Sequence, residues 1–252
     1  MRVSCLRPGL LAALMSLSMS IALPAVAAGS TATSLVDGTG MVIKDMRRLS
    51  PFQSLQLETA AKVVIRQGER ELVEVIAEGN VAPLIDTYVE KRRLYIQDAR
   101  PFRSSQALVV VTVRQIDSID THGAVAVSAN GLDVPLLALR LAGTSAVQLN
   151  DAVIGRLQAA LGGASTLRLS GAADELAAEL GDSAALRAGG FEARAVSLLG
   201  GGTSQAALWA TETLSISLGG SAAVGFYGKV TPSLATSGAA TVKHLGAAPD
   251  RP

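Results

Sequence analysis

The sequence predicts an all-β protein: a parallel β-helix (β-solenoid) with coils of about 19 residues, preceded by an irregular set of short N-terminal strands. Glycines recur at nineteen-residue intervals from Gly143 to Gly238, and Gly123 precedes them by one twenty-residue step. Leucines recur at the same interval just before these glycines, at Leu161, Leu180, Leu199 and Leu218. A fixed period of this length indicates one short unit that is stacked repeatedly, with room for two or three strands per coil.

The first 27 residues have the pattern of a secretory signal peptide. Arg2 and Arg7 precede an apolar run at 10–23, and a small-x-small cleavage site follows at 25–27. The run is shorter than the about 20 apolar residues of a membrane span, and serines interrupt it. We therefore expect cleavage after Ala27, export, and no membrane span in the mature chain.

The mature chain lacks the residues and the charge for several kinds of chemistry. Cys5 lies ahead of the apolar run, so cleavage removes the only cysteine and excludes disulfides and thiolate chemistry. Cleavage also removes two of the 22 basic residues and none of the 21 acidic ones, which leaves a net charge of −1. A near-neutral chain has no electrostatic reason to bind nucleic acid. Aromatic residues make up only 3% of the chain, which indicates a narrow interior filled by small side chains.

The mature chain divides into three parts. Residues 28–45 are small and polar without sustained periodicity, and we expect a flexible leader there. A single solenoid domain is expected at 46–246, since no linker interrupts the repeats, and a short tail at 247–252. Apolar residues alternate with polar ones in short runs from Phe52 onward, which predicts strands that cover one end of the solenoid. These runs lie at 55–57, 63–65, 72–75, 94–96 and 109–113.

From Ile119 onward the repeat outweighs local propensity. Residues 173–180 are rich in Ala, Glu and Leu, a composition typical of a helix. The equivalent segment 213–218 alternates polar and apolar residues as a strand does. Residues related by a fixed period share one conformation, so we expect a strand at 173–180. The same reasoning predicts one buried column made of Leu161, Leu180, Leu199 and Leu218, and a second made of Leu157, Leu176, Ala195 and Leu214.

No column of the repeat carries a residue suited to catalysis or to binding a metal or cofactor. The calcium-binding solenoid coil needs an aspartate two residues before its inward leucine, and Ser165, Ala184 or Ala222 stands there. The acidic residues fall in different columns, and His122 and His244, the two histidines, are expected about six coils apart. We therefore expect no catalytic, metal or cofactor residues and no enzyme.

Two surface features have more than one interpretation. Arg168, Arg187 and Lys243 each follow an inward apolar residue and are expected on one outer face, either as a stripe that contacts anionic glycans or as ordinary solvated surface. Trp209 and the pair at 226–227 either fill a widened terminal coil or form a platform on which sugars stack. Neither feature fixes a binding residue.

Several segments of the N-terminal strands are shared with a known family. They lie at 63–69, 73–75, 80–85 and 94–96 and are followed by coils rich in Gly and Ala. In these features the chain resembles the head GIN domain of auto-transporter adhesins over about 52–246, although the family's Ser-Gly-Ala-Gly corner is kept only loosely, as Ser-Gly-Ala-Ala at 237–240. The resemblance implies a secreted β-helical domain in the periplasm or at the cell surface of a bacterium, with no catalytic residues to carry over.

These observations lead to one functional expectation with two alternatives. We expect a non-enzymatic envelope protein that presents an adhesin-like solenoid surface to a glycan or a protein. The alternatives are a carbohydrate-active β-helix enzyme and a purely structural periplasmic module. The expected partners are a glycan, an envelope protein, or a second copy bound through the solenoid ends or faces, because uncovered strand edges and apolar patches mark interfaces.

Overall fold

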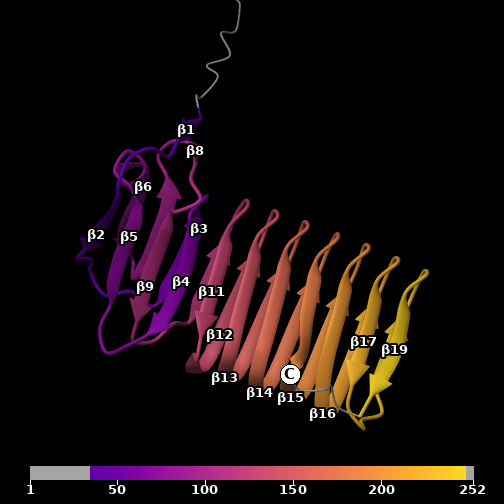
Figure 1. The fold of residues 1–252 in the computed structure, drawn as a ribbon. Helices are drawn as coiled ribbons and strands as arrows, with labels where there is room; N and C mark the ends of the chain where they lie inside the picture. The colour runs from indigo at the N-terminus through magenta and orange to yellow at the C-terminus, as the bar shows by residue number, and fades with distance from the viewer. Residues whose placement is uncertain (1–34, 248–252) are drawn as a thin grey trace, which may run out of the picture. The chain divides into compact units, whose positions relative to one another are not determined.

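The computed structural model describes residues 35–247, which form nineteen β-strands and one short 3-10 turn, η1, with no α-helix among them (Figure 1). The expected signal peptide at 1–27 and nearly all of the expected tail lie outside the described residues. The N-terminal elements are β1 (Val36–Asp37), β2 (Val42–Arg47), β3 (Ser54–Glu58), β4 (Lys62–Gln67), β5 (Leu72–Glu78), η1 (Ala82–Leu84), β6 (Ile85–Glu90), β7 (Arg93–Asp98), β8 (Phe102–Arg103) and β9 (Leu108–Val113). The remaining strands are β10 (Ser118–Thr121), β11 (Ala126–Asn130), β12 (Asp133–Leu141), β13 (Ala146–Leu161), β14 (Thr166–Leu180), β15 (Ala185–Gly200), β16 (Gln205–Leu218), β17 (Ala223–Tyr227), β18 (Ser233–Thr236) and β19 (Thr241–Gly246).

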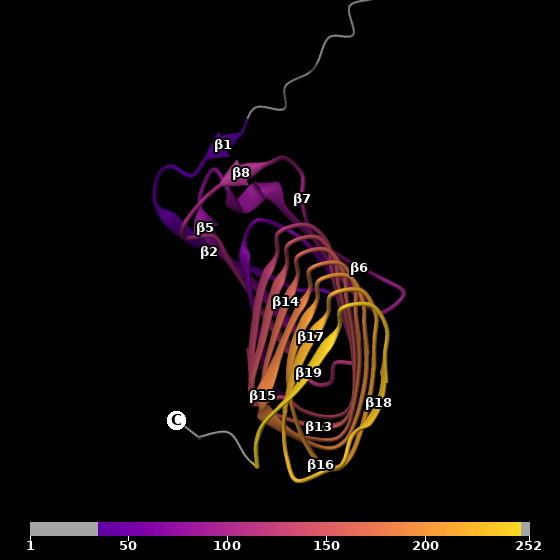
Figure 2. The same ribbon diagram turned by 90° about the vertical axis from the view of Figure 1, so that its right-hand side faces the viewer.

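Each coil is a flattened loop with two opposite faces (Figure 2). We call front face the parallel ladder formed by β7, β3, β10, the C-terminal halves of β12 to β16, and β18. We call back face the ladder formed by β9, β4, β11, the N-terminal halves of β13 to β16, β17 and β19. Each long strand from β13 to β16 therefore runs along the back face, turns a corner, and continues along the front face. The predicted β-solenoid is confirmed.

Antiparallel strands close the N-terminal end of the solenoid. The coil formed by β3 and β4 pairs in parallel with β10 and β11 on one side and with β7 and β9 on the other. Beyond that coil, β6 pairs antiparallel with β7, β5 pairs antiparallel with β9, and β2 pairs antiparallel with β5. The irregular strands thus cover this end, as the sequence predicts. The stretch expected to be a flexible leader, 28–45, contains β1 and the start of β2 within its described part.

The interior is a narrow stack of Ala, Val, Leu and Ile side chains. In β14 the burial alternates along the strand, and Leu176, Ala178 and Leu180 are all buried while Glu179 is exposed. This alternation places residues 173–180 in a strand, so the repeat did outweigh their helix-like composition. Burial of apolar side chains on the inner side of every strand is the main contribution to the stability of such a fold.

The coils are not all nineteen residues long. Along the front face, Leu141 aligns with Leu161, Leu180, Gly200, Leu218 and Thr236, at spacings of 20, 19, 20, 18 and 18 residues. The mean spacing is nineteen residues. Residues that are exactly nineteen apart in the sequence are therefore displaced by one position from the structurally aligned residues in some coils. The buried leucine column predicted from the strict period is therefore wrong at one place. Leu199 points outward and is 51% exposed, and Gly200 takes its position in the column. For the same reason Val196, not Ala195, lies between Leu176 and Leu214.

One turn recurs between the front and the back face of successive coils, with its residue in the left-handed region at Gly143, Gly163, Asp182, Gly202, Gly220 and Gly238. The coils approach closely there: a Cβ added to Gly143 would lie 2.6 Å from the carbonyl oxygen of Gly123, one coil before. Glycine is favoured at this turn both for its backbone angles and for this close approach.

Candidate functional site

A groove of about 1150 Å³ runs along the front face, on the side where the front-face strands end. It extends from β3 and β7 across the ends of β10 and β12 to β16, as far as Ser237 after β18. Eight steps of about 4.8 Å between strands, from β7 to β18, give it a length of roughly 40 Å. The groove therefore crosses most of the stack and is not confined to one coil.

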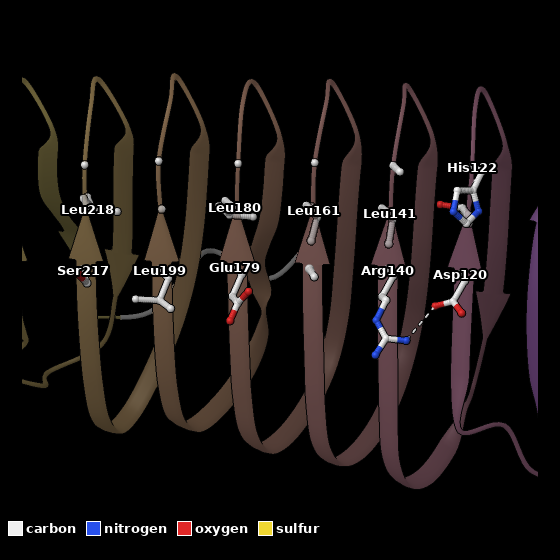
Figure 3. Close-up of a pocket in the computed structure, with 18 of the residues that line it drawn as sticks. Asp120, His122, Arg140, Leu141, Leu161, Glu179, Leu180, Leu199, Ser217 and Leu218 are labelled. Carbon is white, nitrogen blue, oxygen red and sulfur yellow. Dashed lines mark hydrogen bonds and ion pairs between the residues drawn. The ribbon is translucent and has the colours of Figure 1, made fainter.

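One outward side chain from each strand forms the floor of the groove (Figure 3). Parallel pairing aligns these residues in a single column, Gln56, Asp120, Arg140, Ala160, Glu179, Leu199 and Ser217. The next outward position forms the rim, and small residues dominate it: Ala142, Gly162, Gly181, Gly201 and Gly219. Because the rim side chains are small, the groove stays open along its length.

A shared carboxylate organises the N-terminal end of the groove. Asp120 is 6% exposed, and its two oxygens face different arginines. Arg93 Nη1 lies 3.1 Å from Asp120 Oδ2, and Arg140 Nη1 lies 3.5 Å from Oδ1. Arg93 also donates a hydrogen bond of 3.3 Å to Gln56 Oε1. The two arginines fix the position of Asp120, and the exposed Arg140 keeps further donors available to the groove that it lines.

The middle of the groove is less charged. Glu179 is exposed, and no salt bridge links it to another described residue. Leu199 is the only one of the strongly exposed large apolar residues among 35–247 that lines the groove. Two positive and two negative side chains line it in total, Arg93 and Arg140 against Asp120 and Glu179, with His122 at the rim.

Two stacked tyrosines continue the outward column beyond Gln56. Tyr95 is the parallel partner of Gln56, and Tyr88 on β6 is the antiparallel partner of Tyr95. Their ring centroids are 4.9 Å apart with an angle of 6° between the planes, and Tyr88 is 41% exposed. The sequence pattern did not reveal this pair, although the outward position of Tyr95 between the buried Leu94 and Ile96 could have pointed to it.

A smaller hollow of about 500 Å³ adjoins the groove at His122 and contains two carboxyl groups, those of Glu58 and Asp98. Burial raises the pKa of Asp98 above its ordinary value of 3.8, and hydrogen bonds from Thr59 and Ala60 oppose this rise. Thr59 Oγ1 donates to Oδ1 at 2.5 Å, and the Ala60 N–H donates to Oδ2 at 2.8 Å. Both oxygens of Asp98 therefore fix the turn between β3 and β4.

The other sequence candidates lie apart from one another. His122 lines the groove, whereas His244 lies on β19, bonds the Gly228 carbonyl at 2.8 Å, and packs against Phe226 with ring centroids 4.9 Å apart. Among residues 35–247, no three His, Cys, Asp or Glu side chains come together as metal ligands. Three acidic residues of the coils sit in exposed ion pairs: Glu175 with Arg156 at 2.7 Å, and Asp174 and Glu212 with Arg194 at 3.6 and 2.8 Å.

The predicted basic and aromatic features lie on the back face. Arg168 and Arg187 are direct partners on neighbouring coils, while Ala207 and Gly225 separate them from Lys243 in the same column. The stripe is therefore two arginines and a distant lysine.

Of the aromatic residues in the late coils, Phe226 is buried and fills the last coils, while Trp209 and Tyr227 are neighbours on the back face and only partly exposed. A hollow on the back face, lined by residues of β4, β9, β11, β13 and β14, has a volume of about 250 Å³.

The model of one protein family matches residues 51–229: "Putative auto-transporter adhesin, head GIN domain". The chain belongs to this family. The matched segment includes both the N-terminal strands and the coils as far as the end of β17. The resemblance inferred from the sequence is thereby confirmed, and membership fits an exported envelope protein. Among curated proteins, none matches the chain.

Solved structures of similar fold include proteins from Bacteroides and Parabacteroides species. A putative adhesin from Bacteroides fragilis NCTC 9343 superposes with a TM-score of 0.73 at 18% identity, over 83% of this chain and 100% of that one. A putative adhesin from Parabacteroides merdae ATCC 43184 gives a TM-score of 0.63 at 16% identity, over 83% and 98%. A putative lipid binding protein from Parabacteroides distasonis ATCC 8503 gives 0.65 at 13% identity, over 84% and 100%. At these identities the similarity establishes the fold.

Within the described residues, no helix is long and apolar enough to span a membrane.

Proposed function

We propose that this protein is a non-enzymatic, adhesin-like envelope module that binds a glycan or a protein partner on the front face of its solenoid. The observation that carries the proposal is the groove, which runs across the stacked coils and presents one side chain per strand. A surface of this kind suits an extended ligand or a broad partner more than a small substrate, which ordinarily occupies an enclosed pocket. Membership in a family of adhesin heads supports the same conclusion.

The side chains in and near the groove support binding more than catalysis. Asp120 is held between two arginines, and both oxygens of Asp98 accept hydrogen bonds from the β3–β4 turn. A general acid or base needs a carboxyl oxygen that is free to face the substrate, whereas all four oxygens of these two carboxyl groups already have partners in the protein. We infer that these groups organise structure and ligand contacts.

The proposed location is outside the cytoplasm, in the periplasm or at the cell surface. The motivating observation is the apolar run at 10–23 with its small-x-small site, which is typical of a cleaved signal peptide. Amino-terminal sequencing of the exported protein would identify the cleavage site, and a mature chain that still begins at Met1 would contradict this location.

A pair of matched variants tests the role of the groove. Ala160 is exposed on the front-face half of β13, and Ala146 is exposed on the back-face half of the same strand. Purified protein is applied to a glycan array and to isolated envelope proteins, alongside Ala160→Trp and Ala146→Trp. We expect saturable binding that Ala160→Trp removes and Ala146→Trp retains. Equal binding by all three proteins, or no saturable binding at all, would contradict the proposal and favour a purely structural module.

The enzyme alternative rests on the hollow that contains Glu58 and Asp98. If it were correct, purified protein would release new reducing or unsaturated ends from a polysaccharide, and Asp98→Asn would abolish that release. We expect no such turnover by either protein.

A further inference from the structure

The floor of the groove repeats in space at the distance between neighbouring strands. Each strand contributes one outward residue about 4.8 Å from the next, so groups able to form hydrogen bonds recur along the stacking axis. Gln56, Asp120, Arg140, Glu179 and Ser217 supply them. A linear polymer with hydroxyl groups at regular intervals is complementary to such a row, whereas a compact ligand could use only a small part of it.

The backbone of the front face is already fully paired. Every strand that forms the groove floor, from β3 and β10 through β16, has a hydrogen-bonded neighbour on both sides. An extended peptide is ordinarily recognised by adding a strand to an open edge, where backbone groups are unpaired. No such edge exists along the groove floor, so side chains must provide the recognition there.

The groove also lacks the features of a protein-binding surface. The cores of protein interfaces are enriched in large apolar and aromatic residues and depleted of charges. Here Leu199 is the only strongly exposed large apolar residue in the groove, and its neighbours along the floor are the charged Glu179 and the polar Ser217. Polar groups with one apolar contact are better matched to sugars than to a protein core.

The charges in the groove balance. Arg93 and Arg140 are matched by Asp120 and Glu179, and three of the four are joined through Asp120. A carboxylate offers several acceptor positions and a guanidinium five donors, so the fixed Asp120–Arg140 pair can bond adjacent hydroxyls of one sugar. Because no excess of positive charge is present, an uncharged polysaccharide is favoured over an acidic one.

An aromatic surface lies at one end of this row. Tyr88 and Tyr95 continue the column from Gln56, and the exposed Tyr88 stands on β6, which pairs antiparallel with β7 at the end of the front face. Aromatic rings with polar tips offer an apolar face to the C–H side of a sugar ring. The order along the face is therefore the aromatic pair, Gln56, the Asp120–Arg140 pair, and then Ala160, Glu179, Leu199 and Ser217.

From these observations we propose that the occupant of the front-face groove is a linear, uncharged polysaccharide that lies along the stacking axis. It extends from the Tyr88–Tyr95 pair over Asp120 and Arg140 toward Leu199 and Ser217. The inference rests on the proposed function, since it names the ligand class of that same groove. Because the contacts are distributed over many strands, the affinity should depend mainly on the length of the polysaccharide.

Calorimetric titration with defined oligosaccharides tests this directly. The probes are cellohexaose, mannohexaose, xylohexaose and chitohexaose, the corresponding disaccharides, and polygalacturonate as an acidic comparison. We expect at least one neutral hexasaccharide to bind at least about tenfold more tightly than its disaccharide, because each further sugar adds contacts to a preorganised row. If no neutral hexasaccharide binds, if its disaccharide binds equally well, or if only polygalacturonate binds, the inference is wrong.

Variants locate the bound chain on the front face. Ala160→Trp should weaken hexasaccharide binding about tenfold or more by blocking the floor, whereas Ala146→Trp on the back face should leave it unchanged. Replacing both tyrosines, as Tyr88→Ala with Tyr95→Ala, should weaken the hexasaccharide more than the disaccharide. Equal thermal melting of the variants confirms that each is folded. Equal effects of the two tryptophan variants would overturn the placement.

The outcome also separates this inference from the broader function. If neutral oligosaccharides fail but an envelope protein binds and Ala160→Trp removes its binding, the groove remains the binding surface and only the polysaccharide is wrong. If neither kind of ligand binds, both proposals fail.

Discussion

The carboxylate of Asp182 accepts a hydrogen bond of 2.8 Å from the backbone N–H of Gly163, its counterpart one coil earlier. Both residues occupy the turn between the front and back faces, and both have positive φ, 50° for Asp182 and 67° for Gly163. Asp182 is the one position among the turns from Gly143 to Gly238 where a side chain replaces glycine. Its hydrogen bond explains how a side chain is accommodated in a backbone conformation that most residues resist.

Asp182→Ala should therefore destabilise the protein, whereas Asp182→Gly should be close to neutral. Alanine in the left-handed region costs about 1 to 2 kcal/mol and cannot bond Gly163. Glycine loses the same hydrogen bond but relieves the backbone. Urea denaturation of the two variants measures the difference, and an alanine variant as stable as the glycine variant would show that the turn has relaxed.

Two leucines one nominal repeat apart should respond very differently to truncation. Leu180→Ala removes a buried side chain and should cost about 2 to 5 kcal/mol of unfolding free energy through the cavity it leaves. Leu199→Ala truncates a side chain that is 51% exposed and should change stability by no more than about 0.5 kcal/mol. Chemical denaturation tests the pair, and equal shifts in midpoint would mean that the column is misassigned.

Ser165→Ala and Ser204→Ala should each raise stability. Both hydroxyls are buried and have no hydrogen-bond partner among the described residues, and Ala184, which stands between them in the same column, is also buried. Alanine therefore fits the site and removes an unsatisfied polar group, a gain of about 1 kcal/mol. Ser145→Ala is the control. The Ser145 hydroxyl accepts a hydrogen bond from Thr121, so this variant should be less stable than the unmodified protein. A decrease in melting temperature for Ser165→Ala would contradict the prediction.

Asp98 gives the protein a defined pH dependence. Burial raises its pKa above 3.8 in the folded state, so the folded protein binds this proton more tightly than the unfolded chain does. Its contribution to stability is therefore present at low pH and is lost as pH rises from 3.8 through the folded pKa.

Asp98→Asn should remove this part of the pH dependence, and Thr59→Val should raise the pKa further by removing a hydrogen bond to the ionised form. Carbon-detected NMR titration of the Asp98 carboxyl measures the shift. A folded pKa at or below 3.8 would contradict the assignment.

We propose that the C-terminal end pairs with a second copy of the chain. Within the described residues, β18 pairs only with β16 and β19 only with β17, and Leu234 on β18 is 50% exposed although it aligns with the buried Ile216. Exposed strand edges tend to pair with other strands. At the N-terminal end of the solenoid, antiparallel strands of the same chain supply this pairing. Light scattering should show dimers at micromolar concentration, and Leu234→Lys should return the protein to a monomer. A wild-type protein that stays monomeric would refute this contact.

The fold was predictable because a strict repeat averages out local ambiguity. The strand at 173–180 was correct despite its helix-like composition, since its repeat partners were unambiguous. The burial of Leu199 was wrong because periodicity gives the mean coil length, while burial depends on the length of each coil. The groove was missed for another reason. Asp120 and Arg140 are brought together by pairing across coils, and a column of dissimilar side chains has no periodic signature.

Differences in coil length are confined to one part of each coil. The register shifts between neighbouring coils fall between Leu149 and Ala152, between Arg168 and Ser170, and between 187 and 195, all where the chain passes from the back face to the front face. These corners absorb the differences in coil length, so a residue gained or lost there leaves the pairing register of the front face unchanged. Insertions and deletions at the corners can therefore accumulate during evolution while the residues on the groove floor keep their even spacing.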